Sequence, residues 1–250
     1  DIESDALEAA AKSLFEEGVE TIQVVVDVSD AEQMDRLAMR VGEELGDPHV
    51  ICLNAGVSGG GGPLETLTTA DWEWGIGVNL WGVIHGLRVF LGDMKSRDAG
   101  HVVITSSIAG IINSPQAGPY HATKHAVAGL SESLYRELEG TGVSVHCLCP
   151  NLVRTEIFNS ERNRDDGVEM TASQTATIAP LREAITAMGI TTAKVAGDIM
   201  DALRNDEFWI FTHDMTKQAL AVRHEDIKAG RNPTNPYAGI EGLEEVASLD

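Results

Sequence analysis

Short continuous apolar runs alternate along the chain with longer segments in which apolar residues recur every three or four positions. The first pattern is typical of strands buried on both faces of a sheet, and the second is typical of helices with one buried face. Strands are therefore predicted at residues 22–26, 50–53, 102–105, 143–148 and 208–212. Helices are predicted at residues 5–17, 30–45, 69–95, 117–139, 193–204 and 215–229, whereas residues 151–190 are polar and show no clear period.

This order of elements predicts an α/β fold with a doubly wound parallel sheet of the Rossmann type, in one domain over residues 1–230. Ligands of such folds bind at the carboxyl ends of the strands. Polar or turn residues stand at the predicted strand ends, namely Asp27, Asn54, Ser106, Ser107 and Pro150. The Pro/Gly-rich residues 231–250 are predicted to form a tail or an arm onto a neighbouring subunit.

The pair Tyr120 and Lys124 carries the most specific chemistry in the sequence. Residues four apart on a helix lie on the same face, so the ammonium would lie beside the phenol. A nearby cation favours the phenolate, which would make Tyr120 a usable proton shuttle. A Tyr-x-x-x-Lys pattern alone is weak, because it also arises by chance. Ser107, thirteen residues upstream, and the neighbouring strand ends make it much stronger.

Six motifs occur in a fixed order with characteristic spacing. They are Asp27-Val28, Asn54-Ala-Gly56, Val78-Asn79-Leu80, Thr105-Ser-Ser107 with Gly110, Tyr120-x-x-x-Lys124 and Pro150-x-x-Val153-x-Thr155. Over most of residues 1–213 the chain resembles the short-chain dehydrogenase/reductase family. The resemblance implies that the protein binds a nicotinamide dinucleotide. It also implies hydride transfer between this cofactor and a carbinol or carbonyl carbon.

The resemblance also implies catalytic roles. Tyr120 would be the general acid/base, and Lys124 would lower the pKa of Tyr120 and hold the nicotinamide ribose. Ser107 would bond the substrate oxygen, and Asn79 would hold a water that relays protons from Lys124 to solvent. Two alternatives stay open: Ser106 could take the place of Ser107, and Asn79 could simply cap or kink the long helix.

A second set of residues is implied to hold the cofactor. It comprises Asp1, Asp27, Val28, Asn54, Ala55, Gly56, Pro150, Val153 and Thr155, together with Tyr120 and Lys124. Asp27 could instead be a turn residue before a helix, and Asn54-Ala-Gly56 could be only a tight turn. An acid at Asp1 would repel a 2′-phosphate, so NAD is expected rather than NADP.

The Gly-rich fingerprint of the family, Thr-Gly-x-x-x-Gly-x-Gly between a strand and a helix, does not occur in this sequence. Asp1-Ile2-Glu3 resembles the acidic stretch that follows the second strand of the family. We therefore expect that the sequence lacks the first βα unit and the second strand and is a fragment of a longer gene product.

Charge and cysteine usage limit the possible partners. The net charge of −21, from 39 acidic and 18 basic residues, argues against nucleic acid and anionic membranes as partners. Eighteen consecutive apolar residues do not occur, so a membrane-spanning helix is not expected. Cys52, Cys147 and Cys149 are predicted to be buried free thiols of a cytoplasmic protein. His121 and His125 lack an evident third ligand, so a metal site is not expected.

Residues 59–62 are predicted to form a mobile loop near the mouth of the active site rather than a phosphate loop. Trp74 and Trp81 are interpreted as packing residues. A substrate lid is expected at about residues 154–190, with Ile157 and Phe158 as possible apolar wall residues.

The stretches 76–79, 118–120 and 159–164 resemble bacterial Cα-dehydrogenase-type members of the family. This favours an NAD-dependent oxidoreductase that interconverts a secondary alcohol and a ketone, possibly a bulky aromatic or alicyclic one. The alternatives are a non-catalytic dinucleotide-binding sensor or scaffold, and an inactive fragment of such an enzyme. The family also implies a homodimer or homotetramer, paired through the helices predicted at 69–95 and 117–139.

Overall fold

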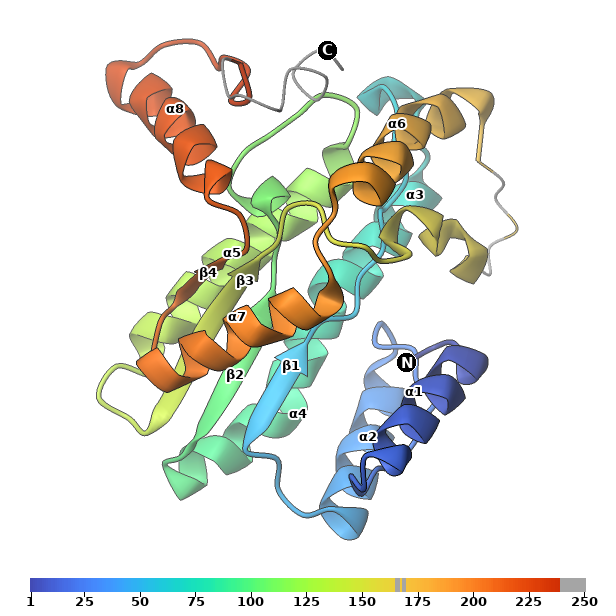
Figure 1. Ribbon diagram of the computed structural model, residues 1–250, viewed down its shortest axis with the longest axis vertical. Helices are drawn as coiled ribbons and strands as arrows, with labels where there is room; N and C mark the ends of the chain where they lie inside the picture. Colours follow the sequence, from blue (N-terminus) through green and yellow to red (C-terminus); the bar gives the residue numbers. More distant parts are fainter. Residues whose placement is uncertain (165–166, 168–169, 239–250) are drawn as a thin grey trace.

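The computed structural model describes residues 1–164, 167 and 170–238. Its centre is a parallel sheet of four strands in the order β1-β2-β3-β4 (Figure 1). The strands are β1 (Val50–Leu53), β2 (Gly100–Thr105), β3 (Val143–Cys149) and β4 (Trp209–Phe211). The register pairs Ile104 with Cys147 and Cys147 with Trp209. The four predicted strands between residues 50 and 212 are thus confirmed.

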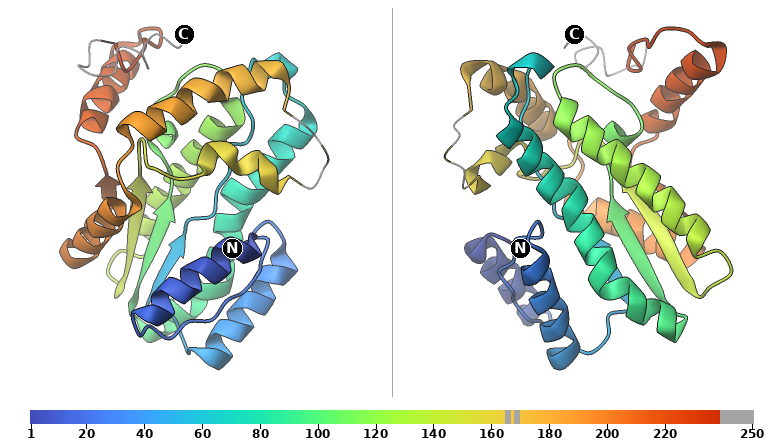
Figure 2. Two further views of the ribbon diagram at one scale, coloured as in Figure 1. Left: turned by 45° about the vertical axis from the view of Figure 1, so that its right-hand side comes forward. Right: turned by 180° about the vertical axis from the view of Figure 1, so that it is seen from behind.

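Helices cover both faces of this sheet, as the doubly wound prediction requires. The helices α4 (Gly82–Arg97) and α5 (Gly118–Glu137) lie on one face, and α7 (Thr192–Asn205) lies on the other (Figure 2). Successive strand residues point to opposite faces, so β2 feeds two cores. Ile104 packs into the cluster under α4 and α5, whereas Val103 packs into the cluster under α7.

The predicted helix at 69–95 consists of three parts. The first is α3 (Thr69–Ile76), which starts with a capping box between Thr68 and Asp71. A π-helical turn, Gly77–Trp81, then leads into α4. By length and composition alone the run Thr69–Arg97 could cross a membrane, with a third of its most apolar window buried in the protein. Core helices of soluble proteins meet the same criterion, so the expectation that the protein has no membrane partner stays a prediction.

The strand predicted at residues 22–26 is wrong. The segment is irregular, and the N–H of Val26 donates to the carbonyl of Asp1 at 3.0 Å. An apolar run becomes a strand only beside a partner strand, and within the described residues β1 pairs with β2 alone. The helices α1 (Ser4–Glu16) and α2 (Ala31–Glu44) flank this segment beside the β1 edge of the sheet (Figure 1).

The region without a clear period contains two helices. A 3₁₀ segment, Ile157–Asn163, is followed by α6 (Ala172–Met188). A short parallel bridge between Val153 and Ile190 joins the two ends of the region. The remaining elements are α8 (Met215–Ala229) and the 3₁₀ turns Leu64–Thr66 and Ile108–Gly110.

Two predictions about burial need correction. Cys147 and Cys149 are buried free thiols as predicted, but Cys52 is exposed. Its side chain lies on the face of the edge strand β1 that is opposite α4. On that face α7 makes its main contacts with β3 and β4, so it does not cover Cys52. The glycine run 59–62, predicted as a mobile loop near the mouth of the active site, is buried. Gly59 lies against Gly75 of α3 and Pro119 of α5, and its φ of 72° is a left-handed conformation that glycine adopts without strain.

Candidate active site

A cavity of about 1570 Å³ opens at the carboxyl ends of the strands. Pockets for single drug-sized ligands measure about 300–1,000 Å³, so this cavity has room for a large cofactor and a substrate together. Its wall includes Asn54 after β1, Ser107 after β2 and Pro150 after β3. The structure therefore brings together residues that the sequence placed at separate strand ends.

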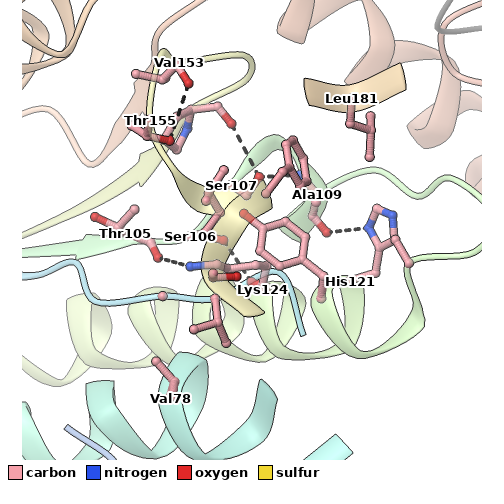
Figure 3. A pocket seen from close by; sticks show the side chains of 18 of the residues that line it. Val78, Thr105, Ser106, Ser107, Ala109, His121, Lys124, Val153, Thr155 and Leu181 are labelled. Atoms are coloured by element: carbon pink, nitrogen blue, oxygen red, sulfur yellow. Dashed lines mark hydrogen bonds between the residues drawn. The ribbon is translucent and has the colours of Figure 1, made fainter. Parts of the chain in front are cut away.

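Tyr120 and Lys124 lie one turn apart near the start of α5, and both line the cavity. Lys124 is 3% exposed, and its Nζ lies 5.7 Å from the centroid of the Tyr120 ring. The ammonium donates to the carbonyl oxygen of Thr105 at 2.9 Å (Figure 3). Within the described chain this is its one hydrogen bond, so two of its three N–H groups remain for a ligand.

The pKa values of these two groups are shifted by the same cause. Burial raises the pKa of the Tyr120 phenol, and hydrogen bonding to Ser107 opposes this more weakly. Burial lowers the pKa of Lys124 to about 8, against the opposing effect of the Cys149 and Cys147 thiols. The net shift of the Tyr120 pKa in this structure is upward, because desolvation of the phenol dominates. A lowering effect of Lys124 on this pKa stays a prediction.

The two serines after β2 have different contacts. Ser106 is 1% exposed, and its Oγ donates to the carbonyl of Lys124 at 2.8 Å, which fixes the loop to α5. The Oγ of Ser107 accepts from the N–H of Ala109 at 3.1 Å, and it also interacts with Tyr120. Of the two alternatives that the sequence left open, Ser107 is the serine beside the phenol.

Asn79 is fully buried in the π-helical turn and does not line the cavity itself. Its Oδ1 accepts from the N–H of Val57 at 2.8 Å, and its Nδ2 donates to the carbonyl of Val57 at 3.0 Å. A Cβ on Gly56 would lie 3.3 Å from this Oδ1 and 3.5 Å from Nζ of Lys124. Gly56 thus keeps the space between Asn79 and Lys124 open, while the water relay between them stays a prediction.

The residues predicted to hold a cofactor all line the cavity. They are Asp1, Asp27, Val28, Asn54, Ala55, Gly56, Tyr120, Lys124, Pro150, Val153 and Thr155. Asp27 also forms the turn before α2, where its Oδ1 accepts from the N–H of Ser29 at 2.9 Å and from its hydroxyl at 2.7 Å. The free ammonium donors of Lys124 and the bare backbone at Gly56 fit a ribose and a closely approaching cofactor.

The opposite wall of the cavity comes from segments that follow β3 and α8. Ile157 and Phe158, the two predicted wall residues, line it, and so does Leu181 of α6 (Figure 3). The segment Pro233–Tyr237 also lines it. Neither α6 nor this segment shows a strong apolar period, so the sequence did not predict them as walls of the cavity. Of the predicted tail or arm at 231–250, residues 233–237 thus return to the chain's own cavity, and residues 239–250 lie outside the described residues.

A buried ion pair joins Arg164, which lies in the segment predicted as a lid, to Asp71 of α3. Arg164 Nη1 lies 2.6 Å from Asp71 Oδ1, and their side chains are 5% and 2% exposed. The Arg164 guanidinium also lies 5.0 Å from the centroid of the Trp74 ring, and both residues line the cavity. At the outer edge, Arg162 pairs with Glu3. The packing interpretation of Trp74 therefore missed its place in the cavity wall.

His121 fixes the loop that leads into α5. Because a carbonyl can only accept, Nδ1 of His121 carries the proton that is donated to Ala109 at 2.9 Å (Figure 3). Its Nε2 then accepts from the N–H of Ser114 at 3.1 Å. Burial lowers the pKa of this imidazole, in agreement with the neutral form that the two bonds require. In the part of the chain that the structure describes, no group of three potential metal ligands occurs.

The fold and the cavity define a Rossmann-type protein with a Ser, Tyr and Lys set at a dinucleotide-sized site. The family model for short chain dehydrogenases matches residues 1–166. A 1-deoxy-11-beta-hydroxypentalenate dehydrogenase of Streptomyces exfoliatus is 30% identical, over 91% of this chain and 77% of that protein. A C alpha-dehydrogenase of a Sphingobium strain is also 30% identical, over 91% of this chain and 75% of that protein.

A solved structure gives the same result. The short-chain dehydrogenase/reductase of Burkholderia phymatum in complex with NAD has a TM-score of 0.90 and 38% identity, and the match covers 94% of this chain and 86% of that one. This chain belongs to the short-chain dehydrogenase family. It is an oxidoreductase that acts on CH–OH donors and uses a nicotinamide dinucleotide.

Proposed function

We propose that the protein is an NAD-dependent oxidoreductase that interconverts a bulky secondary alcohol and its ketone, with Tyr120 as the acid/base. The main support for this proposal is that Ser107, Tyr120 and Lys124 lie together at one wall of a cavity large enough for a dinucleotide. When bound, the nicotinamide supplies the site that accepts or gives the hydride.

The chain's own residues manage the proton and the oxygen of the substrate. Ser107 Oγ holds the substrate oxygen beside Tyr120, whose phenolic oxygen takes the proton in oxidation and returns it in reduction. The spare donors of Lys124 hold the ribose hydroxyls and keep the ammonium beside the phenol. Asn79, across the gap kept open by Gly56, holds the water that connects Lys124 to solvent.

The raised pKa of Tyr120 sets the expected pH dependence of the two directions. A phenol that keeps its proton at neutral pH is ready to reduce a ketone. Alcohol oxidation needs the phenolate, so its rate rises with pH towards the pKa of Tyr120, whereas ketone reduction falls above that pKa.

The choice of NAD over NADP is supported by carboxylates at the cavity. Asp1 and Asp27 both line it, and a carboxylate beside the adenosine ribose repels a 2′-phosphate. The structural relative from Burkholderia phymatum was solved with NAD. We expect kcat/KM to be at least tenfold higher with NAD than with NADP, and Asp1→Ala to narrow this ratio. A preference for NADP in the unaltered chain would refute the assignment.

The substrate class is supported by the volume and the apolar wall of the cavity. Ile157, Phe158 and Leu181 line the side away from the strands. The names of the two relatives, a hydroxypentalenate dehydrogenase and a C alpha-dehydrogenase, agree with the oxidation of a hydroxyl-bearing carbon. A large neutral alcohol with an aromatic or alicyclic body fits this cavity.

We further propose a homodimer or homotetramer, paired through α4 and α5. Two large aromatic side chains stay accessible there: Tyr135 of α5 is 42% exposed, and Trp81, in the π-helical turn just before α4, is 49% exposed. The mass in solution, measured by light scattering against the 26.7 kDa chain, checks this assembly.

Replacing Tyr120 with Phe tests the proposed chemistry. Removing the general acid/base is expected to lower kcat by about 10²–10⁴-fold on 1-phenylethanol or a larger aryl alcohol. NAD binding, measured by calorimetry, is expected to change little, because the ring stays in place. Tyr135→Phe, on the outer part of the same helix, is the matched control and should keep full activity.

The same experiment separates the rival functions. A sensor or scaffold would bind NAD and show no alcohol turnover before or after the substitution. An inactive fragment would not bind NAD at all. Unchanged turnover in Tyr120→Phe would refute the role of Tyr120 as the proton carrier.

A further inference from the structure

The chain after α8 folds back onto its own cavity. α8 ends at Ala229, and Gly230 turns the chain with a φ of 62°, a left-handed conformation that glycine adopts without strain. Figure 1 shows the segment returning from the outer end of α8 over the top of the molecule. The five residues Pro233–Tyr237 line the same cavity as Ser107 and Tyr120.

One carboxylate holds this returning segment in place. Asp226 in α8 is 5% exposed. Its Oδ2 accepts from the N–H of Thr234 at 3.0 Å and from the hydroxyl of Thr234 at 2.6 Å, while its Oδ1 accepts from Nε of Arg231 at 3.0 Å. The bonds from Thr234, followed by that from Arg231, lower the pKa of this carboxyl, so it stays ionised at neutral pH.

The hydrogen bonds that join Asp226 to Arg231 and Thr234, here called the clasp, position Tyr237. The Asn235 side chain accepts from the N–H of Tyr237 at 2.9 Å, which turns the chain once more. Tyr237 then packs against a cluster of buried residues on the loop after β2 and on α8. Members of this cluster are Ile108, Ile111, Ile112 and Ala219. Three of them follow Ser107 directly, so the Tyr237 ring is adjacent to the catalytic loop.

The Tyr237 hydroxyl is available for a ligand. Among the described residues it has no hydrogen-bond partner, although burial raises the pKa of this phenol to about 12 and keeps it neutral. The residues of segments 113–117 and 176–185 that line the same cavity carry no formal charge either. This end of the cavity therefore suits a neutral ring rather than a carboxylate or a phosphate.

Building on the proposed function, we propose that Pro233–Tyr237 is a wall of the substrate site and that Tyr237 determines specificity for uncharged, ring-bearing alcohols and ketones. Asp226 is the positioning residue that holds this wall in place. The wall contributes to affinity for the bulky part of the substrate, whereas Ser107 and Tyr120 act on its oxygen.

Binding of 2-acetonaphthone, a bulky neutral aryl ketone, tests the wall without requiring turnover. Calorimetry with the full chain in the presence of NAD should give a Kd about tenfold weaker for Tyr237→Ala, the upper range for loss of one aromatic contact. Tyr237→Phe keeps the ring and should stay within about threefold of the unaltered protein. Tyr237→Leu, which preserves apolar packing on the cluster, replaces the alanine variant if that variant does not fold.

The outcomes distinguish this proposal from the proposed function. A weaker Kd in Tyr237→Ala supports the wall even if no alcohol is turned over. An unchanged Kd, or no binding of the ketone by the unaltered protein, overturns the wall even if smaller alcohols such as 2-butanol are oxidised. KM for 2-butanol should change less than twofold in Tyr237→Ala, because this alcohol is too small to reach the ring.

A double-mutant cycle tests the role of Asp226. Asp226→Asn weakens the clasp and should raise the Kd for 2-acetonaphthone about fivefold, the equivalent of one ordinary neutral hydrogen bond. The matched control is Glu225→Gln, because Glu225 is its exposed neighbour on α8, and this variant should leave the Kd unchanged. In a Tyr237→Ala background Asp226→Asn should have little further effect. Additive effects of the two substitutions would overturn the positioning role.

Discussion

The two sides of the cavity are built in different ways. The side that we propose as catalytic carries Ser107, Tyr120 and Lys124, with Asn79 buried behind Gly56. Its supports are fully buried contacts between the backbone and short side chains, such as the bond from Ser106 to the carbonyl of Lys124. The substrate side consists of Ile157–Asn163, α6 and Pro233–Tyr237. It is held partly by hydrogen bonds of exposed side chains, such as the bond from Thr177 to Gln116.

Because of this difference, the residues proposed for the chemical step and those proposed for substrate specificity lie on separately built parts of the molecule. The catalytic side is attached to the sheet and α5, so its geometry follows from the fold. The substrate side is formed by the segments that follow β3 and α8. These segments can change in sequence without disturbing the strand ends. The buried anchors of this side include the ion pair of Arg164 with Asp71 and the carboxylate of Asp226.

The largest expected effect comes from closing the gap between the catalytic loop and α5. A Cβ on Gly110 would lie 2.2 Å from Ser106 Oγ and 2.5 Å from the carbonyl oxygen of Lys124. Backbone cannot yield as a flexible side chain can, so Gly110→Ala should destabilise the fold by about 3 kcal/mol. It should also move Lys124 away from Tyr120 and lower activity. Chemical denaturation and steady-state kinetics measure the two effects.

Gly129 provides the matched control for this substitution. It lies on α5 as well, and a Cβ there would meet nothing within 4 Å. Gly129→Ala should therefore stabilise the protein by about 0.5–1 kcal/mol through helix propensity alone. If Gly110→Ala proved as stable as Gly129→Ala, the catalytic side would be less tightly built than its contacts indicate.

The catalytic side could be predicted from the sequence because its spacing is local and its residues stand at strand ends. Tyr120 and Lys124 share a helix face, and Ser107 follows a clearly apolar strand. The strand predicted at 22–26 failed because an apolar run does not reveal whether a partner strand lies beside it. The net upward shift of the Tyr120 pKa could not be predicted, because it is caused by burial, which spacing does not reveal.

The substrate side could not be predicted in the same way. α6 contains Pro180 and has only a weak apolar period, so the sequence did not predict a helix over these seventeen residues. The wall at Pro233–Tyr237 depends on the contact between Asp226 and Thr234, eight residues apart across a turn. Such contacts between polar side chains leave no periodic signal in the sequence.

A smaller effect is expected at Lys124, because burying its charge lowers the free energy of unfolding. Burial lowers the pKa of Lys124 from 10.5 to about 8, and such a shift costs the native state about 3 kcal/mol when the lysine is charged. Lys124→Met removes this cost but also loses the bond to Thr105, which contributes about 1 kcal/mol. The variant without cofactor should therefore be about 2 kcal/mol more stable at pH 7, although inactive.

The sign of this effect depends on pH. Between pH 8 and 10.5 the unfolded chain holds a proton on Lys124 that the native chain has lost, so the stability of the unaltered protein rises with pH in this window. The advantage of Lys124→Met should shrink across the same window, vanish at about pH 9.5 and reverse above it, because the lost bond to Thr105 then outweighs the remaining cost of the charge. Urea denaturation at pH 7 and pH 10 measures it. An equal gap at both pH values would contradict the buried, destabilising ammonium.

The smallest expected effect lies on the substrate side, at Gln116. This residue adopts a left-handed φ of 62°, which is strained for any residue except glycine. Its carbonyl accepts from the N–H of Gly62 at 2.7 Å, and its Oε1 accepts from Thr177 of α6 at 2.8 Å. Gln116→Ala and Gln116→Gly both remove the bond to α6, so each should raise KM for a bulky alcohol about fivefold and leave kcat nearly unchanged. They should differ in stability, since only the glycine variant releases the strain and should be about 1 kcal/mol more stable than the alanine variant. A fall in kcat equal to the rise in KM would show that the two sides of the cavity are coupled more tightly than their separate construction suggests.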